Sequence, residues 1–164
     1  MYRAVVIPFV FLALISPAAA SDLPLRKAGK WEQTTVMDEG GKRHEQTLTI
    51  CIDADMERNT AVASDAEHKQ SCSKYEVKKQ GAAVTVEANC KMNGRDVESR
   101  TEMSGDFQNA FTVKISSTTS GVQESQSISI PRVIEQQGKY LGESCGDLKA
   151  GEAMGTDGAK ILVQ

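Results

Sequence analysis

The sequence has few of the residues from which catalytic and metal sites are commonly built. Its 164 residues include two histidines and four cysteines, and no phosphate-binding or dinucleotide-binding motif occurs among them. A Cys-x-x-Cys pair, which brings two thiols together in redox and zinc sites, is also absent. These absences argue against redox or zinc chemistry at the thiols, and we expect no cofactor.

Positive charge is in short supply as well. The chain carries 19 lysines and arginines against 22 acidic residues, a formal net charge of −3, and the basic residues are scattered among the acidic ones. A protein that neutralises phosphate groups needs a basic face. We therefore expect neither nucleic acid nor an anionic membrane surface as a partner.

Long apolar runs are missing too. The longest, residues 4–15, is shorter than the roughly 20 residues that cross a bilayer, so no membrane span is predicted. The run follows Arg3 and precedes Pro17 and the alanines 18–20, which is the three-part pattern of a secretory signal peptide. We predict that residues 1–20 are a signal peptide and that the mature, exported chain begins at Ser21.

Beyond residue 30, apolar and polar residues alternate with a period of two between glycine and asparagine turns. This pattern predicts an all-β fold with minor α content. We expect one β domain over residues 21–148, an antiparallel meander of about seven strands that forms a curved sheet or a partly open barrel. The predicted strands span residues 30–37, 43–52, 74–80, 82–90, 95–104, 106–117 and 121–131, and Pro131 is expected to end the last of them.

Residues 53–71 break the alternation and favour a short helix, which Asp53 or Asp55 would cap. The acidic residues also alternate as in a calcium loop, but Arg58 stands at the place of the turn glycine and Ser64 at that of the closing glutamate. A helix is therefore the favoured interpretation. Either this segment or the C-terminal region is expected to cover the apolar face of the sheet.

The last residues, 149–164, are rich in glycine, alanine, aspartate and lysine, and we predict a flexible tail. The alternative is that its apolar end, residues 161–163, docks as an additional edge strand. The sequence leaves both open.

Four cysteines in an exported chain indicate two structural disulfides, with three possible pairings. Cys51 lies on the strand face opposite Leu48 and Ile50, and Cys72 directly precedes a new strand. This favours Cys51 with Cys72 and Cys90 with Cys145, and the sequence does not exclude the other pairings.

Several features of the chain resemble one bacterial family. They are the opening Gly29, Lys30, Trp31 and Glu32, the cysteine order, and the closing segment 139–145 that ends in Cys145. Together they resemble the family named domain of unknown function 3617 over residues 25–148. The resemblance implies a periplasmic envelope protein of proteobacteria with no established activity or ligand. The first turn, residues 38–41, departs from the Pro, Gly and Met that many members carry there.

The leading hypothesis is a non-enzymatic periplasmic protein that binds a small apolar molecule on the sheet or an envelope protein along an exposed edge. The predicted walls of a ligand site are the aromatic residues Trp31, Tyr75, Phe107 and Phe111. A lone tryptophan is also a common core residue, so Trp31 has a second interpretation.

Two competing hypotheses remain at this stage. The first is a small hydrolase or isomerase that uses carboxylates such as Asp53 and Glu57; the histidines His44 and His68 are expected to lie at the surface. A catalytic or metal-binding His44 would not tolerate replacement by alanine, whereas a surface histidine would. The second is a purely structural or stress-related envelope protein that has no ligand.

Overall fold

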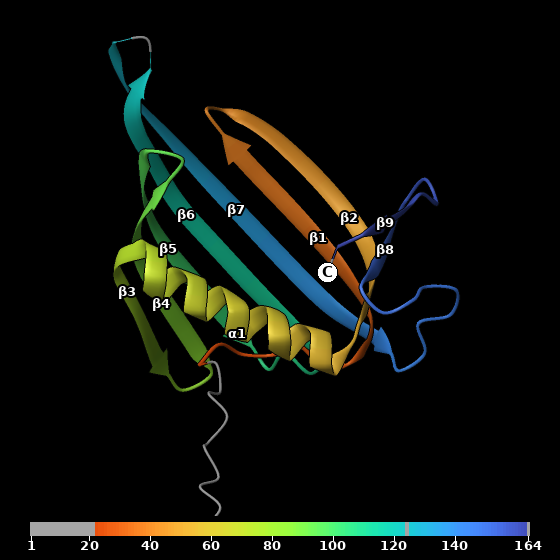
Figure 1. The fold of residues 1–164 in the computed structure, drawn as a ribbon. Coiled ribbons are helices and arrows are strands. Elements are labelled where there is room, and N and C mark those ends of the chain that lie inside the picture. The colour runs from red at the N-terminus through yellow and green to blue at the C-terminus, as the bar shows by residue number, and fades with distance from the viewer. Residues whose placement is uncertain (1–21, 124, 164) are drawn as a thin grey trace, which may run out of the picture.

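The structure, a computed structural model, describes residues 22–123 and 125–163, so the predicted signal peptide lies outside the described residues. Within them the chain folds as one sheet crossed by a single helix (Figure 1). The strands are β1 (Gly29–Glu39), β2 (Lys42–Ile52), β3 (Cys72–Gln80), β4 (Ala83–Met92), β5 (Arg95–Gly105), β6 (Ala110–Gln123), β7 (Gln126–Gly142), β8 (Glu152–Gly155) and β9 (Lys160–Leu162), and the helix is α1 (Ala54–Ser71).

All neighbouring strands are antiparallel, in the order β3-β4-β5-β6-β7-β1-β2-β8-β9. The strands β3 to β7 form a meander, and the hairpin β1–β2 joins it along β7. The described sheet is open, with β3 and β9 at its two edges. The predicted all-β class and the antiparallel, open sheet are confirmed, with nine strands in place of seven.

The strand β7 is longer than predicted, and the expectation that Pro131 ends a strand is wrong. β7 continues through Pro131, which pairs with Thr118 of β6 on one side. On the other side, β1 pairs with β7 only from Arg132 onward. Pro131 therefore lies where the strand has one neighbour, an edge position at which a missing amide hydrogen is tolerated.

The C-terminal residues are folded onto the sheet, as in the docked alternative. β8 pairs with β2, and β9 pairs with β8 at the edge. Ala153 of β8 is 0% exposed and belongs to the core. The amide of Gly151 donates to the carbonyl oxygen of Cys51 at 3.0 Å, which fixes the start of β8 beside β2.

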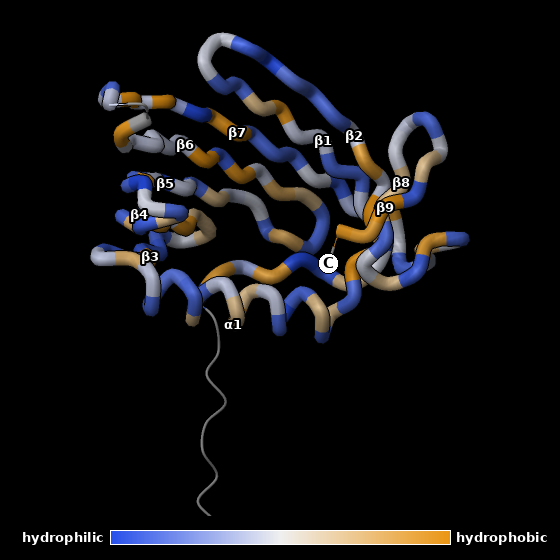
Figure 2. Tube along the Cα trace, turned by 45° about the horizontal axis from the view of Figure 1, so that its top comes forward, coloured by the Kyte–Doolittle hydropathy of each residue, from blue (hydrophilic) through white to orange (hydrophobic). Residues whose placement is uncertain are grey.

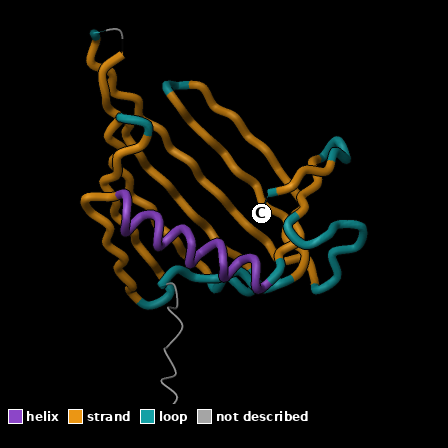
Figure 3. The backbone as a smooth tube through the Cα atoms, viewed as in Figure 1, coloured by secondary structure: helices purple, strands orange, loops and turns teal. Residues whose placement is uncertain are grey.

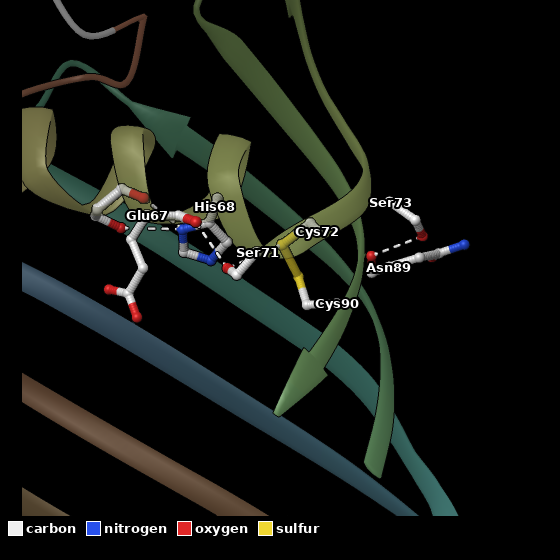
Figure 4. Close-up of a disulfide and its surroundings, with 8 residues drawn as sticks. Glu67, His68, Ser71, Cys72, Ser73, Asn89 and Cys90 are labelled. Atoms are coloured by element: carbon white, nitrogen blue, oxygen red, sulfur yellow. Dashed lines mark hydrogen bonds between the residues drawn. A yellow bond between two sulfur atoms is a disulfide. The ribbon is translucent and has the colours of Figure 1, made fainter. Parts of the chain in front are cut away.

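The two disulfides are Cys51–Cys145 and Cys72–Cys90, so the favoured pairing is wrong. Cys72 and Cys90 are register partners on the adjacent strands β3 and β4 (Figure 4). The connection from β7 to β8 has to pass the ends of β1 and β2, and Cys51 lies there. The order of the strands in the sheet thus brings Cys145 to Cys51. The alternation of side chains along a single strand does not reveal that these two residues are neighbours.

The helix begins as the sequence predicts. Asp53 is its N-cap, and its carboxylate accepts hydrogen bonds from the amides of Asp55 and Met56, both at 3.0 Å. A side chain in this place satisfies amides that have no partner within the helix. Among the described residues, no helix is both long and apolar enough to cross a bilayer.

The core lies on the face of the sheet that α1 crosses (Figures 1 and 3). Trp31 of β1 is 0% exposed, its indole nitrogen donates to the carbonyl oxygen of Lys27 at 2.8 Å, and its ring lies against Phe111 and Tyr140. The opposite face carries ion pairs such as Arg100 with Glu87 at 2.8 Å. One face of the sheet is therefore apolar and the other is in water, as the alternation predicts.

Candidate functional site

The space between α1 and the sheet holds a cavity of about 630 Å³, here called the α1 cavity. The helix comes closest to the sheet at the edge strand β3 and its neighbour β4. It passes over the remaining strands at a greater distance, which leaves the cavity between them (Figures 1 and 3). Its volume lies in the range of small-molecule sites, about 300–1,000 Å³.

The floor of the α1 cavity is the apolar face of the sheet. It joins residues from four strands with Phe107 from the loop that precedes β6. The apolar side chains of this floor are Leu48, Ile50, Ile52, Val86, Met103, Phe107, Phe111, Val113 and Ile115. Successive side chains of a strand point to opposite faces of the sheet, so residues at every second position share one face. Most residues of the floor are β-branched or aromatic, the types that are common in strands.

The roof of the α1 cavity is the inner face of α1, and it is mostly polar. The lining residues of the helix are Glu57, Thr60, Ala61, Ser64 and His68. Their spacing of three and four residues places them on one side of the helix. In Figure 2 the helix alternates between hydrophilic and weakly hydrophobic residues, whereas hydrophobic positions recur along the strands above it. A polar helix thus faces an apolar sheet across the cavity.

One end of the α1 cavity is lined by an ion pair between Arg26 and Glu57. The guanidinium donates from Nε and Nη2 to the two carboxylate oxygens at 2.8 and 2.7 Å, and Nη1 donates to the Oε1 atom of Gln33 at 3.2 Å. The side chains are 19% and 11% exposed. The pair joins the N-terminal segment, residues 22–28, to α1, and its two charges neutralise each other.

The other end of the α1 cavity holds two stacked rings. His68 of α1 and Tyr75 of β3 have ring centroids 5.3 Å apart. Burial and, secondly, the hydrogen bond to Asp65 raise the pKa of Tyr75 to about 12, so its hydroxyl stays protonated at neutral pH. Nδ1 of His68 donates to the carbonyl oxygen of Ser64 at 2.6 Å. Figure 4 shows His68 beside the helix end that the Cys72–Cys90 disulfide joins to β4.

A tight loop presents Phe107 to the cavity. Phe107 has a φ of 55°, and its ring stacks on Phe111 with centroids 5.2 Å apart. The carboxylate of Asp106 accepts hydrogen bonds from the amides of Gln108, Asn109 and Ala110 at 2.9, 2.7 and 3.1 Å. These bonds, that of Asn109 first, hold the pKa of Asp106 well below its usual range.

A family model described as "Protein of unknown function (DUF3617)" matches residues 26–145, which is most of the chain. The chain belongs to this family. The match begins at Arg26 and ends at Cys145, so it contains the ion pair, α1, both disulfides and the strands β1 to β7. No curated protein and no solved structure matches the chain.

Three of the four predicted ligand-binding residues of this DUF3617 protein line the α1 cavity, namely Tyr75, Phe107 and Phe111. Trp31 does not line the cavity; it lies fully buried in the core beside Phe111, the position that was its second interpretation. His44 is exposed on β2, whereas His68, which was expected at the surface, is half-buried and lines the cavity.

The charged and amide residues that line the cavity were not predicted as ligand-binding from the sequence. Glu57 was a candidate catalytic acid and part of the calcium-like acidic pattern, and Arg26 and Gln33 had no predicted role. Part of the signal was available, because Glu57, Ser64 and His68 stand at helical spacing within residues 53–71. Arg26 could not be identified as the partner of Glu57 from the sequence, since it precedes Glu57 by 31 residues and the fold alone brings the two together.

The carboxylates that the enzyme hypothesis would use have structural partners in this DUF3617 protein. Asp53 caps α1, and Glu57 binds Arg26. Within residues 22–123 and 125–163, no three histidine, cysteine, aspartate or glutamate side chains come together as metal ligands would.

Proposed function

We propose that this DUF3617 protein acts without catalysis and holds a small, largely apolar molecule in the α1 cavity. The observation that carries the proposal is the separation between α1 and an apolar sheet face, which leaves about 630 Å³ over Ile50, Phe111 and Val113. Covering apolar surface is favourable by roughly 25 cal/mol per Å². A molecule that fills the cavity would therefore gain binding free energy from the floor alone.

We also propose that the protein works in the periplasm. The pattern of residues 1–20 supports export, and the two disulfides, Cys51–Cys145 and Cys72–Cys90, suit an oxidising compartment. The binding role is supported over acid catalysis because Asp53 and Glu57 are engaged in the cap and in the ion pair.

A second candidate function is the binding of an envelope protein along β9. This edge strand exposes Ile161 by 45% and Leu162 by 74%, and an exposed edge is where another chain can add a strand.

Native mass spectrometry of the mature protein, purified from its own envelope without reductant, tests the proposal. The expected spectrum shows the chain with two disulfides intact and an additional small molecule, which organic solvent then releases for identification. A protein without any adduct, whose solvent extract contains no lipid-like molecule and which binds no apolar dye, would contradict it. Cross-linking to one envelope protein in that case would favour the β9 function.

A further inference from the structure

We propose that the ligand of the α1 cavity is an uncharged amphiphile. Its apolar chain lies on the sheet, and its hydroxyl, ester or amide group lies inside the cavity facing α1. This inference rests on the proposed function and adds the chemical class of the ligand. Three features of the cavity carry it: the apolar part of the floor, the hydroxyl groups of the roof, and the ion pair in which Arg26 and Glu57 neutralise each other.

The floor is apolar on β2, on β4 and on β6, and one glutamine each from β7 and β1 lines the cavity between β6 and β2. Ile50, Phe111 and Val113 are each less than 10% exposed and form one continuous cluster with Met103 and Ile115 packed against it. Such a surface offers van der Waals contact and burial, and it offers no partner for a polar group. The part of the ligand that lies there has to be apolar.

The roof offers hydroxyl groups, and inner strands of the sheet add a hydroxyl and an amide group. Thr60 and Ser64 line the cavity from α1, and Ser99 and Gln136 line it from β5 and β7. Hydroxyl and amide side chains both donate and accept hydrogen bonds and carry no charge. A hydroxyl, ester or amide group of a ligand would find partners among them, whereas a purely hydrocarbon ligand would leave them facing an apolar surface.

The charged side chains that line the cavity are Arg26 and Glu57, and they bind each other through two hydrogen bonds of 2.8 and 2.7 Å. A charged group that entered with a ligand would lack a counter-ion, and burying an unpaired charge is costly. A carboxylate that recruited Arg26 would compete with Glu57 for the guanidinium. The cavity therefore selects against both signs of charge.

The test compares three ligands that share a lauryl chain and differ in charge: monolaurin, laurate and lauryl trimethylammonium. Each is titrated into delipidated mature protein by calorimetry, below its micelle-forming concentration and in one buffer. We expect monolaurin to bind about tenfold more tightly than either charged ligand.

A paired variant tests the role of the ion pair. Glu57→Gln keeps the size of the side chain and leaves Arg26 as a net positive charge in the cavity. We expect this variant to bind laurate about tenfold more tightly than the unmodified protein does. Glu67→Gln is the matched control, because Glu67 is exposed on the same helix and does not line the cavity. It should leave all three affinities unchanged.

The outcomes separate this inference from the proposed function. If laurate or lauryl trimethylammonium binds the unmodified protein as tightly as monolaurin, the uncharged class is wrong and the binding function stands. If Glu57→Gln, shown by circular dichroism to be folded, gains no affinity for laurate, the role given to the ion pair is wrong. If none of the three ligands binds, the proposed function fails and this inference fails with it.

Discussion

At the residue scale, Gly138 of β7 makes room for the floor of the α1 cavity. A Cβ atom at this position would lie 2.0 Å from Cε1 of Phe111, so the aromatic ring lies directly over the glycine. Phe111 in turn contacts Trp31, with ring centroids 5.5 Å apart, and stacks on Phe107. The missing side chain of Gly138 thus lets a line of aromatic rings form from the core to the cavity wall.

The variant Gly138→Ala should therefore lose stability. The added methyl group forces the ring of Phe111 to move, and overpacking of this kind costs about 1–3 kcal/mol in the free energy of unfolding. Urea unfolding measures the effect. Gly121→Ala is the control, because its Cβ would meet only the flexible side chain of Arg95, at 3.1 Å. Equal destabilisation by the two variants would contradict the account of Gly138.

Asp106 should contribute to the dependence of stability on pH. The pKa of its carboxyl group is lower in the folded protein than in the unfolded chain, because the amides of residues 108–110 bind the charged form. Its contribution is therefore present at neutral pH and is lost as the pH falls below about 4 toward the folded pKa. Asp106→Asn should be less stable than the unmodified protein at neutral pH, and its stability should fall less steeply below about pH 4.

Urea midpoints measured from neutral to acid pH check this prediction, with Asp38→Asn, an exposed aspartate of β1, as the control. Parallel pH profiles for the unmodified protein and Asp106→Asn would show that the loop hydrogen bonds do not stabilise the charged form.

At the scale of elements, local sequence patterns predicted the secondary structure of each segment better than they predicted which segments lie beside it in the sheet. Alternation along residues 30–52 and 74–90 predicted two hairpins, and the acidic start of residues 53–71 indicated a helix that Asp53 indeed caps. Residues 132–142 were missed as strand because Pro131 suggested an end. Whether proline is tolerated depends on which strand lies beside it, and the local sequence pattern does not predict that neighbour.

The disulfide pairing likewise depends on which strands are neighbours in the sheet. We expect non-reducing peptide mapping to link Cys51 to Cys145 and Cys72 to Cys90. A peptide that links Cys51 to Cys72 would contradict the strand order at the C-terminal edge.

The two disulfides should also differ in how much they contribute to the free energy of unfolding. The sequence separation is 94 residues for Cys51–Cys145 and 18 for Cys72–Cys90. In the loop-entropy model these separations correspond to about 4.5 and about 3 kcal/mol, respectively. Replacing the first pair by serine should therefore lower the free energy of unfolding more than replacing the second, as measured in denaturant. The reverse order would show that strain or residual structure outweighs loop entropy.

At the scale of the whole molecule, the sequence predicted an exported β protein with an apolar sheet face, and it predicted three of the aromatic residues that line the α1 cavity. It could not predict the cavity itself. The cavity exists because α1 is fixed at both ends and passes over the strands between. The Cys72–Cys90 disulfide joins its C-terminal end to β4, and the ion pair of Arg26 and Glu57 joins its first turns to the N-terminal segment. Those connections join residues that are distant in the chain, so neither periodicity nor composition predicts them.

The most direct test of the central claim is a titration of the delipidated protein with N-phenylnaphthylamine, an uncharged apolar fluorophore. The variant Ala61→Phe fills the cavity from the inner face of α1, and Ala63→Phe places the same ring on the exposed side of the helix. The account predicts saturable one-to-one binding by the unmodified protein and Ala63→Phe, and its loss in Ala61→Phe. Equal binding by Ala61→Phe, or no binding by the unmodified protein, would contradict the claim that the α1 cavity holds a small apolar molecule.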